Sequence, residues 1–336
     1  MRTTATATAG HTTDQRVAVG VLGVGVHVPD RVVTNDDLTR DLDTSDEWIA
    51  ARTGIRERRF LEEGRLPSDM CVAAADAALT DADTAAGDLD AVIIATFTFD
   101  RLLPSMALTV AERIGAHRAV CLDLNQAACS GGLYGIWTAM HLFQNNLFRR
   151  VLVIGAEALS RITDPLDRAT RVFFGDAAGA AVLGPVPRGS GVLSWSLGGE
   201  LSEAVRVDAQ GVDTGRRFLR MDGSEVWRQV LSQVPPSVEE TLRLADLKPD
   251  DIDHYVFHQA NKNLVTGLME RLGQPLDKAP TTIETLGNTG AATIFTVLDR
   301  MRSVGDPRPG EHVMFAAIGA GFLWGSLCLR QQESAL

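Results

Sequence analysis

Short apolar stretches alternate along the chain with longer segments in which apolar residues recur at helical spacing. Such alternation predicts buried strands and amphipathic helices packed as a layered α/β fold. The predicted strands are Val17–Val26, Asp90–Thr96, Val120–Leu124, Val151–Gly155 and Asp253–Phe257. The predicted helices are Ser68–Ala82, Ser105–Gly115 and Ser130–Asn145. We expect Ser68 or Asp69, just after Pro67, to cap the first of these helices.

The two halves of the chain share an outline. Phe173–Gly184 and Val313–Leu327 are both apolar segments around a Gly-containing turn. Val120–Leu124 leads into a helix after Cys129, and Asp253–Phe257 leads into a helix after His258. The pattern predicts a duplicated α/β unit with a site at the seam between the copies, where ligand sites are common.

This outline predicts three parts of the chain. Residues 1–16, rich in Thr and Ala, are expected to be a flexible N-terminal tail. Residues 17–184 form the first half, with a candidate cysteine nucleophile, and residues 185–336 form the second half, with His and Asn. The polar segment around Gly184–Asp213 is the expected connector.

Composition narrows the class of protein. The 336 residues are 45% hydrophobic and 22% charged, which is typical of a soluble globular chain. A formal net charge of −11 argues against a nucleic-acid partner. No apolar run approaches the ~18 residues of a membrane span, and the N-terminus lacks the apolar core of a signal peptide. We therefore expect a cytoplasmic protein with no membrane partner.

The four cysteines are too few for a disulfide framework, and none forms a C-x-x-C pair that would suggest zinc. No other spacing indicates a metal. Cys71, Cys121 and Cys328 lie in apolar patterns and are expected to be buried thiols.

Cys129 stands apart because small residues surround it between a predicted strand and a predicted helix. A thiol at a helix N-terminus faces unpaired N–H groups, which favour the thiolate and lower its pKa. A lowered pKa would make Cys129 a nucleophile. The alternative is that it is one more small buried apolar residue.

His258 and Asn288 become informative only together with Cys129. His258 ends an apolar strand, where α/β proteins place site residues, but alone it could be a core histidine bonded to a carbonyl. Asn288 lies in Gly287–Ala292 and alone could be a helix N-cap. As a set they match a Cys-His-Asn site.

With these residues laid out, the chain resembles the β-ketoacyl-[acyl-carrier-protein] synthase III family of the thiolase-like superfamily, from about Val19 to Leu329. The segments that carry this resemblance are Asp43–Ile49, Arg52–Arg58, Ala128–Gly131, Phe174–Ala181, His258–Asn261 and Gly287–Thr289. The resemblance implies a five-layer αβαβα thiolase fold and a homodimer.

The resemblance also implies a mechanism. Cys129 takes an acyl group from acyl-coenzyme A, and an oxyanion hole is formed by the backbone N–H groups of Cys129 and Ala320. His258 and Asn288 then bind the thioester carbonyl of malonyl-acyl carrier protein. Loss of CO₂ leaves an enolate that attacks the acyl group and gives a 3-oxoacyl product. No cofactor is implied beyond the coenzyme A thioesters that serve as substrates.

Further residues are implied in binding. Trp48 and Arg168 would sandwich the adenine of coenzyme A, with Arg52 beside the same nucleotide, whereas Trp48 alone could be a core residue. Gly223, Ser224 and Asn261 are also implied in binding coenzyme A, and Ser224 stands where an Asn commonly lies near the pantetheine arm. Leu103 would line the acyl pocket of the partner subunit.

The chain departs from the family pattern at several positions. Ala320 replaces a common Gly, Leu103 an aromatic residue, Ser224 an Asn, Asn263 a basic residue and Ser130 an Ala. Leu103 favours a longer or branched acyl chain, and Asn263 weakens the case for carrier docking, although Lys262 is adjacent. Together they suggest a starter-loading enzyme of fatty-acid or polyketide-type biosynthesis.

Two other functions stay open on the same residues. Cys129 could pass its acyl group to an alcohol, amine or carrier thiol without forming a carbon–carbon bond. The chain could also be a silent subunit that only shapes a partner's pocket, which the intact Cys129, His258 and Asn288 argue against. A biosynthetic thiolase is disfavoured because Gly319–Gly321 lacks a second cysteine.

Overall fold

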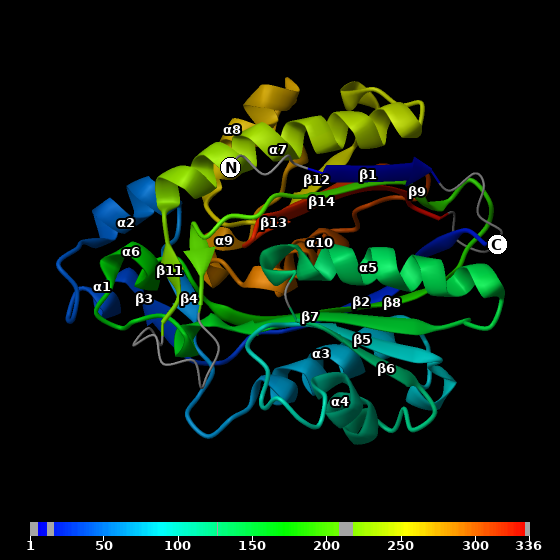
Figure 1. Cartoon of the computed structure of the whole chain (residues 1–336), viewed down its shortest axis with the longest axis horizontal. Helices are drawn as coiled ribbons and strands as arrows, with labels where there is room; N and C mark the ends of the chain where they lie inside the picture. The colour runs from blue at the N-terminus through cyan, green and yellow to red at the C-terminus, as the bar shows by residue number, and fades with distance from the viewer. Residues whose placement is uncertain (1–5, 12–16, 126, 208–217, 333–336) are drawn as a thin grey trace.

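The computed structural model describes residues 6–11, 17–125, 127–207 and 218–332. Two five-stranded sheets alternate with three layers of helices, in the predicted αβαβα order (Figure 1). The helices of these layers are, from the bottom of that view to the top, α3 (Pro67–Asp81) and α4 (Met106–Ile114), α5 (Gly131–Leu142) and α10 (Thr293–Ser303), and α7 (Gly223–Leu244) and α8 (Lys262–Leu272).

The first sheet has the strand order β2-β8-β7-β5-β6. Its strands are β2 (Val19–His27), β8 (Asp176–Pro185), β7 (Val151–Ala158), β5 (Ala91–Ala95) and β6 (Val120–Leu124). Strands β5 and β7 are buried along their whole length because helices cover both faces of the sheet. Strand β6 is the edge strand, and Val120 at its start is exposed.

The second sheet has the order β1-β9-β14-β13-β12. Its strands are β1 (Thr6–His11), β9 (Gly191–Gly199), β14 (Leu323–Arg330), β13 (His312–Gly319) and β12 (His254–Phe257). The run β9-β14-β13-β12 repeats β2-β8-β7-β5, since each has two antiparallel steps followed by one parallel step. This repetition is the duplication that the sequence predicts.

The largest single cluster of buried apolar residues lies between the two sheets, and two further clusters lie on the outer faces of the sheets, one on each. Helices α5 and α10 fill the layer between the sheets with fully or nearly buried side chains such as Leu133, Ile136 and Phe295, which pack among residues of both sheets. Their burial holds in place the turns at which α5 and α10 begin. Cys129 lies in the turn that leads into α5, and Asn288 lies just before the turn that leads into α10.

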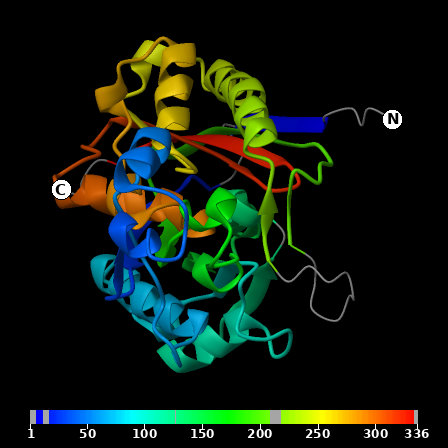
Figure 2. The same ribbon diagram turned by 90° about the vertical axis from the view of Figure 1, so that its left-hand side faces the viewer.

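A group of short elements covers one end of the layers, and Figure 2 shows α1 and α2 there in front of the sheets. The helices and strands outside the two sheets and three layers are α1 (Asn35–Leu38), α2 (Asp46–Thr53), β3 (Val32–Thr34), β4 (Glu57–Arg59), α6 (Arg168–Arg171), β10 (Val205–Arg206), β11 (Arg220–Met221) and α9 (Ile283–Leu286).

Short 3-10 turns occur throughout the described chain. They are η1 (Ala86–Asp88), η2 (Ala128–Ser130), η3 (Phe143–Asn145), η4 (Leu159–Arg161), η5 (Pro249–Asp251), η6 (Leu276–Lys278) and η7 (Gly290–Ala292).

Several predictions about elements are wrong. Residues 6–11 of the expected flexible tail form β1, which pairs with β9, while residues 1–5 and 12–16 lie outside the described chain. The expected connector 184–213 contains β9, an internal strand of the second sheet, and residues 208–213 lie outside the described chain. Both segments form strands because neighbouring strands of the second sheet satisfy their backbone N–H and C=O groups. The sequence pattern of either segment does not reveal these pairing partners.

The predicted correspondence between Val120–Leu124 and Asp253–Phe257 is also wrong. By sheet order β12 is the counterpart of β5, and the second sheet has no counterpart of β6 among the described strands. The segment Val313–Leu327 spans β13 and part of β14, so only its second part corresponds to β8.

The cap of α3 differs from the prediction as well. The helix begins at Pro67, its N-cap is Leu66, and the Asp69 carboxylate accepts a hydrogen bond from the Leu66 N–H at 2.8 Å. Pro67 suits the first helical position because its missing N–H would have no helical partner there. Among the helices of the described residues, none has the length and apolar character to cross a bilayer.

Candidate active site

Cys129 lies in the tight turn η2 between β6 and α5. The residue before it, Ala128, has a φ of 46°, a left-handed conformation that is uncommon for a residue with a side chain. The Ser130 hydroxyl donates to the Ala127 carbonyl at 2.6 Å and closes the turn. Strain of this kind persists where the surroundings impose it and is concentrated at functional sites.

The end of β13 lies directly against this turn. A Cβ added at Gly319 would lie 2.4 Å from the Ala127 carbonyl oxygen and 2.9 Å from the Cys129 nitrogen. Only glycine leaves room for this approach. Ala320, the predicted second donor of the oxyanion hole, is the next residue along the chain, so β13 brings it close to the cysteine turn.

The Cys129 thiol does not have the lowered pKa that its place before a helix predicts. Although the residue is partly accessible, desolvation of the thiol raises its pKa to about 12, and the charge of Glu157 acts in the same direction. A backbone hydrogen bond at Cys129 lowers the pKa but does not compensate. The prediction was wrong because it weighed the helix terminus and not the buried surroundings. At neutral pH the thiol rests protonated.

Asn288 is fixed by bonds to its backbone and to one end of its amide. Its N–H donates to the Phe173 carbonyl at 2.8 Å, and its carbonyl accepts from Gly175 N–H at 3.0 Å. The side-chain Oδ1 accepts from Gly290 N–H at 2.9 Å. Asn288 thus caps the turn η7, as the alternative interpretation expects, but Nδ2 has no hydrogen-bond partner within the described chain. The amide can offer its N–H groups to a ligand.

His258 follows β12 and is buried, with its N–H donating to the Ala316 carbonyl of β13 at 2.8 Å. Burial lowers the pKa of its imidazole to about 4, and the backbone of Gly290 raises it in part. The Nδ1 atom is buried with no hydrogen-bond partner among the residues that the structure describes. A neutral imidazole can donate one N–H without acting as an acid.

Turn η7 brings the three residues into one region. Gly290 bonds to the amide of Asn288 and influences the imidazole of His258. A Cβ added at Gly131, two residues after Cys129, would lie 3.2 Å from the Cβ of Ala291 in η7. The cysteine turn therefore packs against the turn that Asn288 precedes, and the predicted set of three residues comes from three separate parts of the chain.

Trp48, Arg52 and Arg168 also meet. The guanidinium of Arg168 lies 4.9 Å from the centre of the Trp48 ring and that of Arg52 lies 5.5 Å from it. Arg168 is held by a 2.7 Å hydrogen bond to the Asp43 carbonyl. Trp48 is partly buried against a small apolar cluster, so it also serves the core as the alternative expects. A planar base that stacked on Trp48 would take the place that Arg168 now covers.

The other predicted binding residues lie in different places. Asn261 caps α8 by accepting from Asn263 N–H at 2.8 Å and donates to the Arg52 carbonyl at 3.0 Å, so its amide joins α8 to α2. Gly223 and Ser224 are exposed at the start of α7, where Ser224 donates to the Asp222 carboxylate at 2.6 Å. Leu103 is 83% exposed on the loop after β5.

Sequence reasoning missed the residues that support the site. Gln259 accepts hydrogen bonds from Thr282 and Ile283 N–H and so fixes the segment before α9. Arg58 is fully buried, donates to the Val33 and Val172 carbonyls, and has its pKa lowered to about 10 by burial. No spacing indicates these partners, because they are distant in the chain.

Glu157 was missed for another reason. The predicted strand stops at Gly155, whereas β7 continues to Ala158 and carries Glu157 into the sheet, fully buried. A charged residue at the end of an apolar run is ordinarily a sign that the strand has reached solvent.

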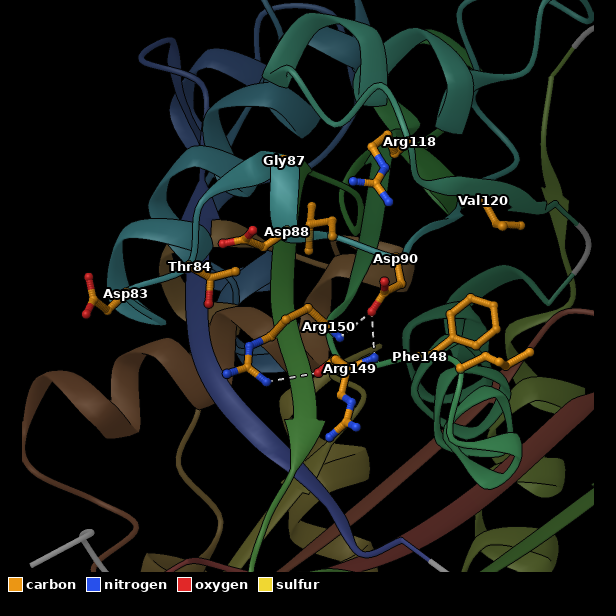
Figure 3. Close-up of a pocket in the computed structure, with 12 residues that line it drawn as sticks. Asp83, Thr84, Gly87, Asp88, Asp90, Arg118, Val120, Phe148, Arg149 and Arg150 are labelled. Carbon is orange, nitrogen blue, oxygen red and sulfur yellow. Dashed lines mark hydrogen bonds between the residues drawn. The ribbon is translucent and has the colours of Figure 1, made fainter.

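Two other features lie away from this region. A hollow of about 780 Å³ at the start of β5, β6 and β7 is lined by both arginines and aspartates, among them Arg118, Arg150 and Asp90 (Figure 3). The Asp90 carboxylate accepts from Arg150 N–H at 3.0 Å. Cys129 follows the other end of β6, so this hollow is not the candidate active site.

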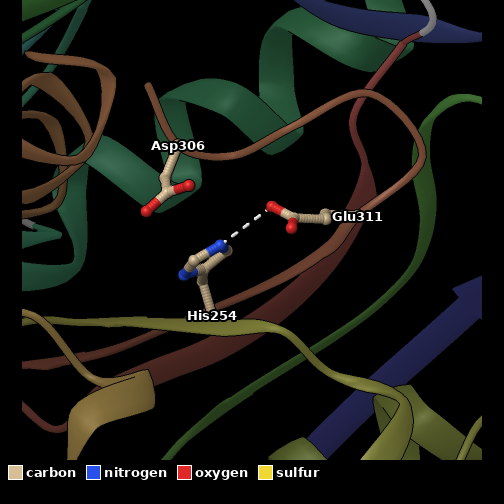
Figure 4. A group of neighbouring side chains, drawn as sticks. All are labelled: His254, Asp306 and Glu311. Atoms are coloured by element: carbon tan, nitrogen blue, oxygen red, sulfur yellow. Dashed lines mark hydrogen bonds and ion pairs between the residues drawn. The ribbon is translucent and has the colours of Figure 1, made fainter. Parts of the chain in front are cut away.

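The second feature is a group of possible metal ligands, His254, Asp306 and Glu311, whose ligand atoms lie within 4.8 Å of one another (Figure 4). Glu311 Oε2 already bonds to His254 Nε2 at 3.0 Å and to Arg308 N–H at 2.7 Å. These bonds tie the loop after α10 to the start of β12, at the opposite end of the strand from His258.

The fold and the grouped residues define a thiolase-like protein. Two family models match the chain, "3-Oxoacyl-[acyl-carrier-protein (ACP)] synthase III" over residues 122–200 and its "C terminal" counterpart over residues 242–331. The curated "Beta-ketoacyl-[acyl-carrier-protein] synthase III 1" of Halalkalibacterium halodurans is 39% identical over 312 residues, covering 93% of this chain and 98% of that protein.

Solved structures agree. The β-ketoacyl-[acyl-carrier-protein] synthase III of Thermus thermophilus has a TM-score of 0.89 at 38% identity, covering 94% of this chain and all of that one. The priming β-ketosynthase of the R1128 polyketide biosynthetic pathway has a TM-score of 0.90 at 32% identity, covering 96% and 98%. The chain belongs to the β-ketoacyl-[acyl-carrier-protein] synthase III family, and the predicted thiolase-like fold is confirmed.

Proposed function

We propose that the protein is a condensing enzyme that joins an acyl group from acyl-coenzyme A to a malonyl thioester with loss of CO₂. The observation that carries this proposal is the orientation of Asn288, whose Oδ1 is occupied by Gly290 and whose Nδ2 is left as a donor. A donor beside a neutral imidazole suits a negative oxygen better than a neutral alcohol. Family membership supports the same reaction.

In the first half-reaction the Cys129 sulfur attacks the acyl-coenzyme A carbonyl and loses its proton. We assign the oxyanion to the backbone N–H groups of Cys129 and Ala320, and the close approach of Gly319, the residue before Ala320, to the Cys129 backbone supports this assignment. Coenzyme A leaves as the thiol and the acyl group stays on the sulfur.

In the second half-reaction the malonyl thioester loses CO₂, and its enolate oxygen receives hydrogen bonds from His258 and Asn288. Burial keeps His258 neutral, with a pKa of about 4, so it donates without changing its charge state at neutral pH. The enolate carbon attacks the acyl carbonyl, and Cys129 leaves as the thiolate and takes up a proton. No cofactor is needed beyond the thioester substrates.

The coenzyme A nucleotide would bind at Trp48, with Arg168 on the other side of the base and Arg52 beside it. Arg168 would have to move away from the Trp48 ring, which it now covers, to admit the base. We assign the pantetheine arm to Gly223, Ser224 and Asn261. The Ser224 hydroxyl is already bonded to Asp222, and the Asn261 side chain caps α8, so we propose that these two residues contribute to the arm's site more by their position than by side-chain bonds.

A homodimer explains two exposed features. Leu102 and Leu103 are 78% and 83% exposed, and β6 presents an unpaired sheet edge. Proteins cover such edges and apolar side chains in stable assemblies. We propose that a second copy covers them and that Leu103 lines its acyl pocket. Malonyl-acyl carrier protein is the proposed second substrate, and the cytoplasm, where both thioesters occur, is the proposed location.

Carrier docking would depend on surface cations near α8. Lys262, which could compensate for the absence of a base at Asn263, is paired with Glu284 at 2.7 Å. Its charge is partly neutralised, so we expect it to contribute to the rate of encounter more than to affinity.

Intact-protein mass spectrometry with a panel of acyl-coenzyme A esters, followed by labelled malonyl-carrier, tests the proposal. We expect one acyl group on Cys129, none on Cys129→Ala, and labelled CO₂ only after the first step. Acyl loading followed by transfer to an alcohol or amine, with no CO₂, would contradict condensation and support acyl transfer instead.

A further inference from the structure

Glu157 is a fully buried carboxyl that no step above uses. No salt bridge reaches it from the described residues, and its partners are neutral. Thr98 Oγ1 donates to Oε2 at 2.7 Å, Thr96 Oγ1 lies 3.3 Å from the same oxygen, and Phe97 N–H donates to Oε1 at 3.3 Å. A buried carboxylate without a cation is costly, so the protonated form is favoured.

The partners of Glu157 form a neutral hydrogen-bond network. Thr98 Oγ1 accepts from Ala158 N–H at 2.8 Å, and its own hydrogen can be directed at Glu157 Oε2 or at Thr96 Oγ1, which lies 3.3 Å away. Because each hydroxyl can both accept and donate, the network can accommodate a protonated carboxyl. Desolvation raises the pKa of Glu157 to about 8, and the bonds from Thr98, Phe97 and Thr96 lower it in part.

Glu157 lies against the turn beside Asn288 and also acts electrostatically on Cys129. A Cβ added at Gly290 would lie 2.6 Å from the Glu157 Cγ, so this side chain supports the turn that orients Asn288. In addition, a charge on Glu157 raises the pKa of the Cys129 thiol. The titratable groups that face it are the thiols of Cys129 and Cys71 and, across Gly290, the imidazole of His258.

We propose that Glu157 is a positioning residue that must stay protonated for condensation, because a negative charge there would oppose the Cys129 thiolate and the enolate beside Asn288. The inference rests on the proposed function and extends it to an electrostatic condition for the reaction. Glu157 forms no bond to substrate and transfers no proton. It acts through the turn at Gly290 and through its charge.

The test compares the rate of labelled CO₂ release from pH 6.5 to 9.5 in the wild type, Glu157→Gln and Thr98→Val. We expect the wild-type rate to fall above about pH 8, roughly tenfold for each further pH unit. Glu157→Gln, which cannot ionise, should lack this alkaline decline. Thr98→Val removes a bond that lowers the Glu157 pKa and should move the decline to higher pH. The exposed Glu239→Gln is the matched control and should keep the wild-type profile.

An unchanged alkaline decline in Glu157→Gln would overturn the proposal. If that variant does not fold, the Thr98→Val variant provides the test. A rate of CO₂ release that declines at the wild-type pH, or at a lower pH, would then overturn the proposal. A purely structural role would change the rate at all pH values alike.

A second measurement separates this inference from the proposed function, because it needs no thioester. Iodoacetamide alkylation of Cys129 at pH 9–10 should be faster in Glu157→Gln than in the wild type, roughly threefold for a half-unit fall in the thiol pKa. Equal alkylation rates would overturn the coupling even if CO₂ release is normal. A faster rate without CO₂ release in any variant would uphold the coupling and reject condensation.

Discussion

At the scale of single residues, the site depends on which end of each polar group is already in use. Asn288 gives its oxygen to Gly290 and keeps its nitrogen for a ligand. His258 is neutral because it is buried, and Cys129 is a protonated thiol for the same reason. Burial therefore sets the charge states of the proposed nucleophile and of the proposed donor before any substrate arrives.

Asn288→Asp tests whether Asn288 acts in the second half-reaction and not in acyl loading of Cys129. The replacement keeps an acceptor for Gly290 N–H and exchanges the free donor for an acceptor. Loss of one oxyanion donor costs about 3–4 kcal/mol, so CO₂ release should fall by 10²–10³-fold. Acyl loading of Cys129, followed by intact mass, should stay within severalfold of the wild type. An equal loss of both half-reactions would contradict the assigned role.

Glu157 predicts a pH-dependent stability. A pKa raised to about 8 means that the folded chain binds a proton that the unfolded chain has released above the ordinary glutamate pKa. The stabilising contribution is fully present below that ordinary value and is lost as the pH rises through about 8. From pH 5 to 8, the free energy of unfolding of the wild type should fall relative to Glu157→Gln, by at most ~1.4 kcal/mol per pH unit. Urea unfolding at several pH values measures this difference in the free energy of unfolding. A difference that stays constant with pH would contradict the prediction.

At the scale of elements, the apolar runs predicted most of the first sheet, because strands covered on both faces have nearly continuous apolar sequences. β9 was not predicted as a strand because its Gly and Ser residues are typical of a linker, yet it is an internal strand of the second sheet. β7 was predicted too short, and the omitted residues include Glu157. The sequence motifs name Cys129, His258 and Asn288, which the fold places in one region, but they do not reveal the residues that support them or their charge states, because both arise from tertiary burial.

The junction of β13 with the cysteine turn predicts the effect of one methyl group. Gly319→Ala would place a Cβ against backbone atoms of Ala127 and Cys129, which cannot move aside as a side chain can. Overpacking of this kind costs about 1–3 kcal/mol. The melting temperature and the alkylation rate of Cys129 should both fall.

Gly87→Ala is the matched control for that substitution, since a Cβ there meets no atom within 4 Å. It should leave both properties unchanged. Wild-type alkylation of Cys129 in Gly319→Ala would contradict the close approach of β13.

At the scale of the whole molecule, the duplication explains why the site lies where it does. The central helices α5 and α10 begin beside each other, and the turns before them carry Cys129 and Asn288. One copy of the unit thus carries the proposed nucleophile, and the other carries the proposed donors. The edge of β6, which no described strand pairs, and the exposed loop at Leu103 lie outside this pair, and we propose that a second copy covers them.

Leu103→Phe tests that wider arrangement. Because Leu103 is 83% exposed, the larger ring should not disturb the protomer. In a dimer it would narrow the partner's acyl pocket, so loading of Cys129 should shift to shorter acyl groups in the mass-spectrometric panel. Sedimentation should give twice the mass of the chain. A monomer, or an unchanged range of acyl groups, would contradict the role of Leu103.

The most direct test of the account is a single turnover of acyl-Cys129 enzyme with labelled malonyl-carrier. The account predicts that the acyl mass leaves Cys129 as CO₂ appears, one for one, and that the carrier gains a 3-oxoacyl group. CO₂ release while the acyl group remains on the sulfur, or loss of the acyl group without CO₂, would contradict it.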